Sequence, residues 1–236
     1  MTNLEMVINE ITNFMDEHLS KVIKEEPIKS KLKELTHGLT VDNLITSDYR
    51  FLIDETERLH DSHYTDEEID EIVARWIREK NCLNPECSAR TQTTIMDCDD
   101  DKCVINHVSI YISSDAICRT MCKHPERSIA DIINHYKLIV RHEYGHFIDY
   151  VMLNGTSYSE FVKRAKEEDS IEKDVYKRMN EFKEKANKDD NISKQDLIYT
   201  YDRMYYEEIP AEKRANEYAK FTPEELERLY TNDGLN

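Results

Sequence analysis

The chain has 236 residues, which is enough for one domain with its own hydrophobic core or for two small domains. Its four glycines stand apart, so it has no glycine-rich phosphate-binding loop, and its longest apolar run, Tyr150–Leu153, is too short to cross a membrane. The formal net charge of −17 disfavours nucleic acid and anionic membranes as partners; it is typical of a highly soluble surface, and attraction of a basic protein is the alternative.

The start of the chain and its cysteines bear on the cellular compartment. The first 26 residues lack the basic start and the apolar stretch of a signal peptide, so we expect a cytoplasmic protein with reduced thiols. Free thiols, a second metal site completed by His107 or His124, and disulfides are the alternatives for the cysteines. All six lie in one window: Cys82, Cys87, Cys98, Cys103, Cys118 and Cys122.

Helical patterns dominate residues 1–85, which we interpret as a helical N-terminal region. A capping box formed by Thr65 and Glu68 opens one of these helices, and Trp76 lies on its apolar stripe. His37 and Gly38 provide a C-terminal stop signal for another. The predicted helices cover residues 4–24, 28–35, 48–60 and 65–80.

The pattern then changes to that of β-strands. Residues Thr91–Met96 are rich in β-branched side chains, and apolar and polar residues alternate in Val104–Ile112. A polar, acidic stretch from Asp97 to Cys103 separates them and is typical of a solvated turn. These features together predict a β-hairpin.

The rest of the chain is again predicted to be helical. Ser128 and Asp131 cap a helix that continues to Leu153 and ends at Asn154 and Gly155. Further helices are expected at 157–186, 194–204, 210–220 and 223–230, with a loop at 189–191. The fold class is therefore α+β, predominantly α-helical with a small β-hairpin or sheet, and residues 86–236 form the second predicted domain.

The chemistry is carried by His142-Glu143-Tyr144-Gly145-His146 within the helix that Ser128 caps. Residues four apart are neighbours on an α-helix, so both imidazoles can bind one tetrahedral Zn²⁺ ion. Glu143 is rotated away from the metal and is suited to act as a general base on a zinc-bound water. Gly145 is unfavourable inside a helix, and the close approach of a strand or substrate would explain it.

The third zinc ligand has to be a carboxylate if the site is complete, because no histidine follows His146. Glu212 is the strongest candidate, since Ala215 permits close packing of its helix and Asn216 is placed to accept a hydrogen bond from a ligand imidazole. Glu208 is the main alternative, with Glu207 and Glu217 in reserve. Asp149 lies on the same face as the histidines and is either a supporting residue or a surface carboxylate.

The pattern H-E-x-x-H followed by E-x-x-A-[DN] resembles the gluzincin class of zinc metallopeptidases. The string from His142 to Asp149 is similar to the zinc helix of lethal-factor-type zinc endopeptidases, H-E-[FYI]-G-H-x-[VIL]-D, and the resemblance covers residues 86–221. It implies a zincin-like domain with Zn²⁺ as cofactor, and it implies that Tyr205, seven residues before Glu212, stabilises the oxyanion. The chain differs in lacking an export signal and in the long run between His146 and Glu212.

We therefore predict a cytoplasmic zinc endopeptidase that acts on a peptide or protein substrate. Glu143 and Tyr205 are the expected catalytic residues, and an extended peptide is expected to pair with Val104–Ile112 as the edge strand. An amidase or another hydrolase would use the same zinc chemistry. A further alternative is a non-catalytic zinc-containing binding module that holds a basic protein partner. The sequence does not determine the oligomeric state.

Overall fold

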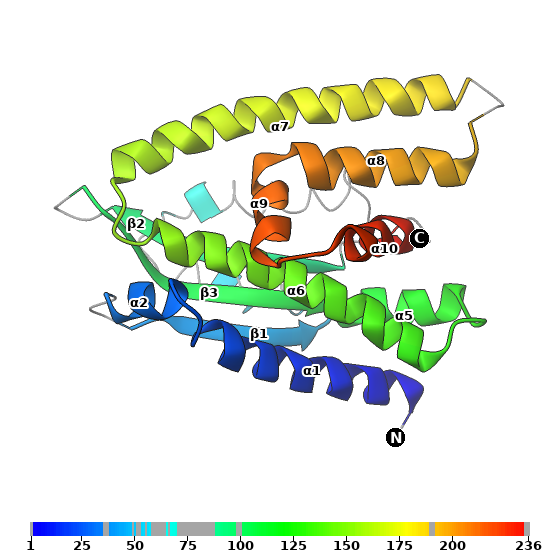
Figure 1. Cartoon of the computed structure of the whole chain (residues 1–236), viewed down its shortest axis with the longest axis horizontal. Helices are drawn as coiled ribbons and strands as arrows, with labels where there is room; N and C mark the ends of the chain where they lie inside the picture. Colours follow the sequence, from blue (N-terminus) through cyan, green and yellow to red (C-terminus); the bar gives the residue numbers. More distant parts are fainter. Residues whose placement is uncertain are drawn as a thin grey trace.

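The computed structural model describes residues 2–34, 38–48, 50, 53–54, 56–57, 65, 67–69, 88–97, 101–188 and 192–233. Within these ranges the chain is mainly helical and contains one mixed sheet, as an α+β class requires. Helix α6 lies across the sheet, and α7 and α8 run side by side on the opposite side of α6 from α1 (Figure 1).

The bounds of the elements agree closely with the predicted ones in the second half of the chain. The strands are β1 (Thr40–Thr46), β2 (Ala89–Asp97) and β3 (Cys103–Ser113). The named helices are α1 (Asn3–Val22), α2 (Ile28–Lys33), α5 (Ser114–Lys123), α6 (Ile129–Leu153), α7 (Tyr158–Ala186), α8 (Lys194–Glu208), α9 (Pro210–Tyr218) and α10 (Pro223–Asp233). Sequence patterns did not identify β1 or α5.

The sheet has the order β1-β3-β2, with β1 parallel and β2 antiparallel to β3. The predicted hairpin of β2 and β3 is confirmed. The expectation that Val104–Ile112 is an edge strand is wrong, because β3 is hydrogen-bonded on both sides. Every residue from Val108 to Ser113 is buried, which is the pattern of a central strand covered on both faces.

Side-chain caps explain where the helices begin. Ser128 accepts a hydrogen bond from the Asp131 amide at the start of α6, and Ser157 does the same for Glu160 in α7. Thr65 and Glu68 form the predicted reciprocal capping box, with distances of 2.8 and 3.3 Å. Trp76, the loop at 189–191 and most of the predicted helices at 48–60 and 65–80 lie outside the described residues.

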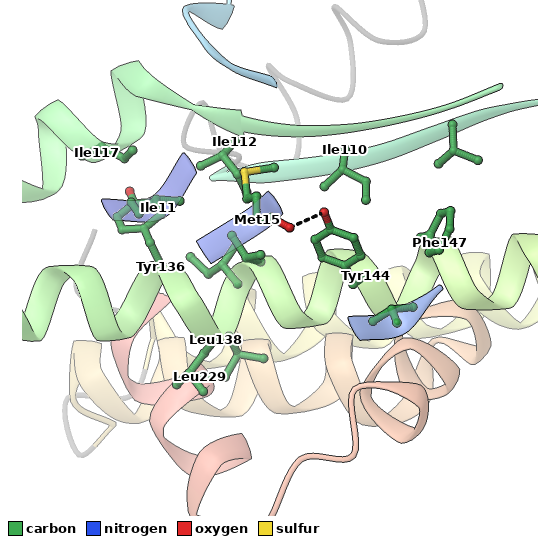
Figure 2. Packing of buried hydrophobic residues seen from close by; sticks show 14 of the residues in the cluster. Ile11, Met15, Ile110, Ile112, Ile117, Tyr136, Leu138, Tyr144, Phe147 and Leu229 are labelled. Carbon is green, nitrogen blue, oxygen red and sulfur yellow. Dashed lines mark hydrogen bonds between the residues drawn. The ribbon is translucent and has the colours of Figure 1, made fainter. Parts of the chain in front are cut away.

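The main hydrophobic core lies between α6, α1 and the sheet. Figure 2 shows Tyr136, Tyr144 and Phe147 extending from α6 toward the sheet and α1, while Leu138 extends toward Leu229 of α10. The Tyr144 hydroxyl, which is buried, donates a hydrogen bond to the Met15 carbonyl oxygen at 2.9 Å. This bond satisfies a polar group that would otherwise be costly to bury.

The N-terminal region shares this core. Val7, Ile11 and Met15 of α1 are fully buried in the same cluster as residues of α6 and β3, and β1 extends the same sheet. The predicted helical N-terminal region, residues 1–85, also contains a strand that was not expected, because β1 places Thr40–Thr46 beside β3. Over the described ranges, no helix combines the length and the apolar character needed to span a bilayer.

Candidate metal centre

Helix α6 places two imidazoles side by side on the surface that faces α9. The Nε2 atoms of His142 and His146 are 3.2 Å apart, as the one-turn spacing of the motif predicts. The His142 side chain is 5% exposed and that of His146 is 14% exposed. The two rings therefore form a nearly buried nitrogen pair whose Nε2 atoms face each other.

Helix α9 brings a carboxylate to this pair. Glu212 Oε2 lies 2.9 Å from His142 Nε2 and 3.4 Å from His146 Nε2. Glu212 is in the first turn of α9, where the helix dipole favours a negative charge. Two ligands 2.0–2.1 Å from a tetrahedral Zn²⁺ ion are roughly 3.3 Å apart, so these three separations fit the spacing of zinc ligands.

A close helix contact explains how Glu212 reaches the histidines. A Cβ atom on Gly145 would lie 2.0 Å from the carbonyl oxygen of Ala215, so only glycine allows α9 to approach α6 so closely. A strand or a substrate was expected to approach Gly145, and the neighbour is instead the backbone of α9. The predicted role of Ala215 in close packing agrees with this contact, because Ala215 is fully buried.

Asn216 determines which nitrogen of His142 carries its proton. Asn216 Nδ2 donates to the Tyr206 carbonyl oxygen at 3.1 Å, which directs Oδ1 toward His142 Nδ1 at 2.8 Å. Since Oδ1 only accepts, Nδ1 has to donate, and in the neutral imidazole Nε2 is left with a lone pair. This supporting contact is the kind that orients histidine ligands in metal sites.

The lone pairs that the side chains of His142, His146 and Glu212 offer suit a metal cation. With His142 neutral, its Nε2 lone pair and the Glu212 carboxylate face each other at 2.9 Å, a contact between two acceptors that a shared cation would make favourable. Burial disfavours the charged form of His146, but the Glu212 carboxylate beside it raises the pKa of His146 overall. Burial likewise opposes ionisation of Glu212, yet the positive charge of His146 holds the pKa of this carboxyl below its usual range. The group therefore favours positive charge at the point where the three side chains meet.

The carboxylate of Glu143 is positioned by the sheet. Glu143 is buried, and its Oε2 accepts a hydrogen bond from the Thr91 hydroxyl of β2 at 2.6 Å. The same hydroxyl lies 3.0 Å from the Glu143 carbonyl oxygen. This role of Thr91 was not predicted from the sequence, because a threonine in a β-branched run carries no signal beyond strand propensity.

Tyr205 contacts the proposed ligand. Its hydroxyl donates to Glu212 Oε1 at 3.1 Å, whereas His142 contacts the other carboxylate oxygen, Oε2. The ring of the next residue, Tyr206, packs edge-on against His142, with centroids 5.2 Å apart. The oxyanion role expected for Tyr205 stays a prediction.

The other carboxylates considered as ligands lie elsewhere. Glu208 pairs with Arg178 at 2.6 Å, Glu207 pairs with Arg203 at 3.1 Å, and Glu217 is exposed. Among the described residues, His142, His146 and Glu212 are the set of histidine, cysteine and acidic side chains close enough to hold one metal ion. Geometry therefore favours Glu212 over Glu208 as the third ligand.

Asp149 is buried, so the expectation of a surface carboxylate is wrong. It pairs with Arg164 of α7 and with Arg214 of α9, with shortest distances of 3.1 Å. Arg214 was not identified from the sequence, since its partner lies 65 positions away in the chain.

Comparisons with protein-family models, with curated proteins and with solved structures gave no match to this chain.

Proposed function

We propose that this chain is a zinc-dependent endopeptidase with a zincin-like fold. The observation that carries the proposal is the meeting of His142 Nε2, His146 Nε2 and Glu212 Oε2 at separations of 2.9 to 3.4 Å, close to those of zinc ligands. Asn216 supports it by directing the His142 Nε2 lone pair toward the shared point. His142, His146 and Glu212 are the residues that would hold the ion.

A zinc ion bound there would polarise a peptide carbonyl and lower the pKa of water, which is the chemistry that amide hydrolysis needs. Glu143 acts as the general base and then as the acid that returns the proton to the leaving amine. Because Thr91 donates to Oε2, we assign the proton transfer to Oε1. The Tyr205 hydroxyl donates its single proton to Glu212 Oε1 in the structure, and in the proposed reaction it leaves this bond and donates to the developing oxyanion when substrate is present.

The proposed substrate is an extended peptide or protein segment. In the described sheet, β2 is an edge strand, and it carries Thr91. Thr91 contacts Glu143, the proposed general base. A peptide aligned along β2 would bring its backbone to Glu143, which moves the proposed peptide site from β3 to β2. We do not propose a nucleic-acid substrate, because a chain with a net charge of −17 repels the phosphate backbone.

The proposed compartment is the cytoplasm. Cys118 and Cys122 lie one turn apart on α5 and are both exposed free thiols. A reducing compartment would keep such exposed thiols from forming disulfides with other chains, and this is the support for the proposed compartment.

The decisive experiment replaces the general base without touching the ligands. We expect Glu143→Gln to keep about one zinc per chain and to lose at least about 100-fold in cleavage of a denatured protein mixture. Glu207→Gln is the matched control, since Glu207 is an exposed glutamate paired with Arg203 on α8. Metal content, chelator-sensitive cleavage and circular dichroism are measured for all three proteins.

Full cleavage by the Glu143→Gln protein would contradict the proposal. A wild-type chain that binds zinc but cleaves neither proteins nor small amides would favour the non-catalytic binding module. Cleavage of small amides alone would favour an amidase.

A further inference from the structure

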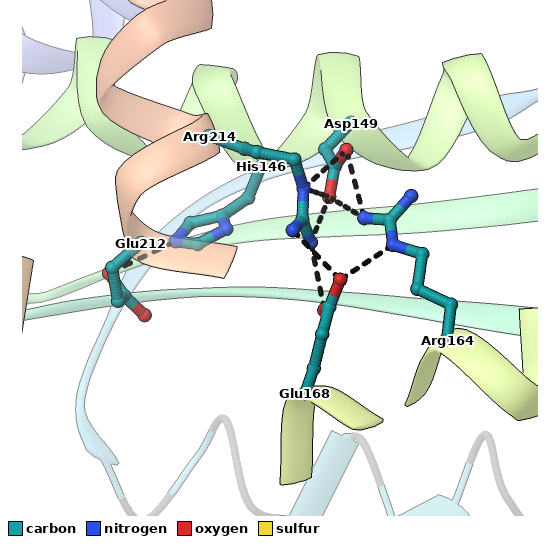
Figure 3. A network of polar contacts seen from close by, with 6 residues as sticks. All are labelled: His146, Asp149, Arg164, Glu168, Glu212 and Arg214. Carbon is teal, nitrogen blue, oxygen red and sulfur yellow. Dashed lines mark hydrogen bonds and ion pairs between the residues drawn. The ribbon is translucent and has the colours of Figure 1, made fainter. Parts of the chain in front are cut away.

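Four charged side chains form a closed ring beside the metal ligands. Figure 3 shows Arg214 of α9 and Arg164 of α7 alternating with Asp149 of α6 and Glu168 of α7. Two positive and two negative charges make the ring neutral overall. We call these four residues the charge ring.

Arg214 uses two edges of its guanidinium group in this ring. Its Nε atom lies 3.1 Å from both carboxylate oxygens of Asp149, and its two terminal nitrogens bind the two oxygens of Glu168 at 2.8 and 3.0 Å. Such fork-shaped pairing fixes direction as well as distance. Arg214 therefore ties α9 to two other helices in a defined orientation.

The ring and the zinc ligands share the same short helix. Glu212 and Arg214 are two residues apart in α9, which has nine residues. The contact of Gly145 with Ala215 holds α9 at one point of α6, and Asp149 lies four residues further on, about 6 Å along the helix axis. Two separated attachments resist rotation of α9, which a single contact would allow.

We propose that Arg214 is a positioning residue for the metal centre. By fixing the rotation of α9 on α6, the charge ring sets where the Glu212 carboxylate meets the two imidazoles. The inference rests on the proposed zinc site, and it assigns Arg214 and Asp149 a function beyond holding the fold together. Lysine cannot replace Arg214 in this role, because an ammonium group lacks the two-edged fork.

The test is the affinity of the purified chain for Zn²⁺ alone, measured by competition with a chromophoric chelator. We expect Arg214→Gln to weaken zinc binding about 10- to 100-fold, the range typical of residues that support metal ligands. Arg214→Lys should also weaken it at least about tenfold although it keeps the charge. This second variant keeps the test valid if the glutamine variant does not fold.

The matched control is Glu225→Gln. Glu225 of α10 pairs with Arg141 of α6, and their side chains are 27% and 21% exposed, close to the 23% and 24% of Glu168 and Arg214. This variant removes a similar ion pair that leaves the charge ring intact. It should lower the melting temperature of the metal-free chain and leave zinc affinity within about twofold of wild type.

Several outcomes would decide the matter. Unchanged zinc affinity in both Arg214 variants would overturn the inference, and so would an equal loss in Glu225→Gln, which would indicate a general effect of stability. A further outcome is that the wild-type chain binds zinc and cleaves nothing while the Arg214 variants lose zinc affinity. That pair of results would support the positioning role and overturn only the endopeptidase proposal. A wild-type chain that does not bind zinc would overturn both.

Discussion

Helix α6 presents apolar side chains to the sheet and α1, and it presents histidines and a carboxylate to α9 and α7. Both sides are buried, but they are stabilised differently. Tyr136, Tyr144 and Phe147 are buried by apolar packing, whereas His142 and Asp149 are buried in contact with polar or charged partners. Apolar packing tolerates several similar shapes, while the polar side requires particular partners at particular distances.

Two histidines show the consequence of this difference. His18 of α1 packs against Tyr144, and its pKa is lowered to about 4, mainly by burial and also by Arg141 and Lys21. His146 is on the polar side, where Glu212 outweighs burial and raises its pKa. Burial thus lowers the pKa of one histidine, and a neighbouring carboxylate reverses the direction for the other.

The largest effect on zinc affinity should come from removing Glu212, the carboxylate that meets the histidines on the polar side of α6. We expect Glu212→Ala to weaken zinc binding more than about 100-fold, because it removes a proposed ligand. Loss of a residue that only supports a ligand typically costs about 10- to 100-fold. Glu208→Ala removes a glutamate that pairs with Arg178 instead and should bind zinc like wild type. Zinc competition titration measures both, and equal affinities in the two variants would move the third ligand away from Glu212.

Gly145→Ala should separate α9 from α6. A Cβ atom there would lie 2.0 Å from the Ala215 carbonyl oxygen, so we expect a loss of about 1–3 kcal/mol in the free energy of unfolding together with weaker zinc binding. Helix propensity alone predicts the opposite, a gain of about 1 kcal/mol. Urea unfolding, monitored by circular dichroism, distinguishes a loss from a gain in the free energy of unfolding. A stabilised Gly145→Ala variant would contradict the close contact.

Thr91→Val should reduce catalysis without changing the metal centre. Valine has the shape of threonine but cannot donate to Glu143 Oε2, so we expect kcat to fall about 10- to 100-fold with KM and zinc content unchanged. Thr91→Ser keeps the hydroxyl and should retain most of the activity. Steady-state kinetics on a peptide substrate test this, and equal rates for the valine and serine variants would exclude an orienting role for the hydroxyl.

The smallest effect is on the pH dependence of stability, and it comes from His18, which packs on the apolar side of α6. The folded-state pKa of His18 is about 4 and its ordinary value is 6.5, so the unfolded chain binds more protons between these values. Stability contributed by the neutral ring is present above pH 6.5 and is lost as the pH falls toward 4. We expect His18→Phe to melt with a weaker pH dependence in this window, while an unchanged slope would contradict the assignment.

Local patterns predicted much of the fold. The cap at Ser128, the hairpin of β2 and β3, and the end of α6 near Gly155 depend on neighbouring residues, so the sequence carries their signals. The strand β1 lacked such a signal, because it is stabilised by pairing with β3, which is distant in the chain. Its residues were interpreted as part of a helical region for that reason.

The spacing of His142, Glu143 and His146 determined by itself that two imidazoles and a carboxylate would lie within one turn of a helix, because helix geometry is local. Only the tertiary structure decided that Glu212 faces them, that Thr91 holds Glu143, and that Asp149 is buried against Arg214. These contacts join elements far apart in the chain, and their distances depend on how closely α9 and β2 approach α6.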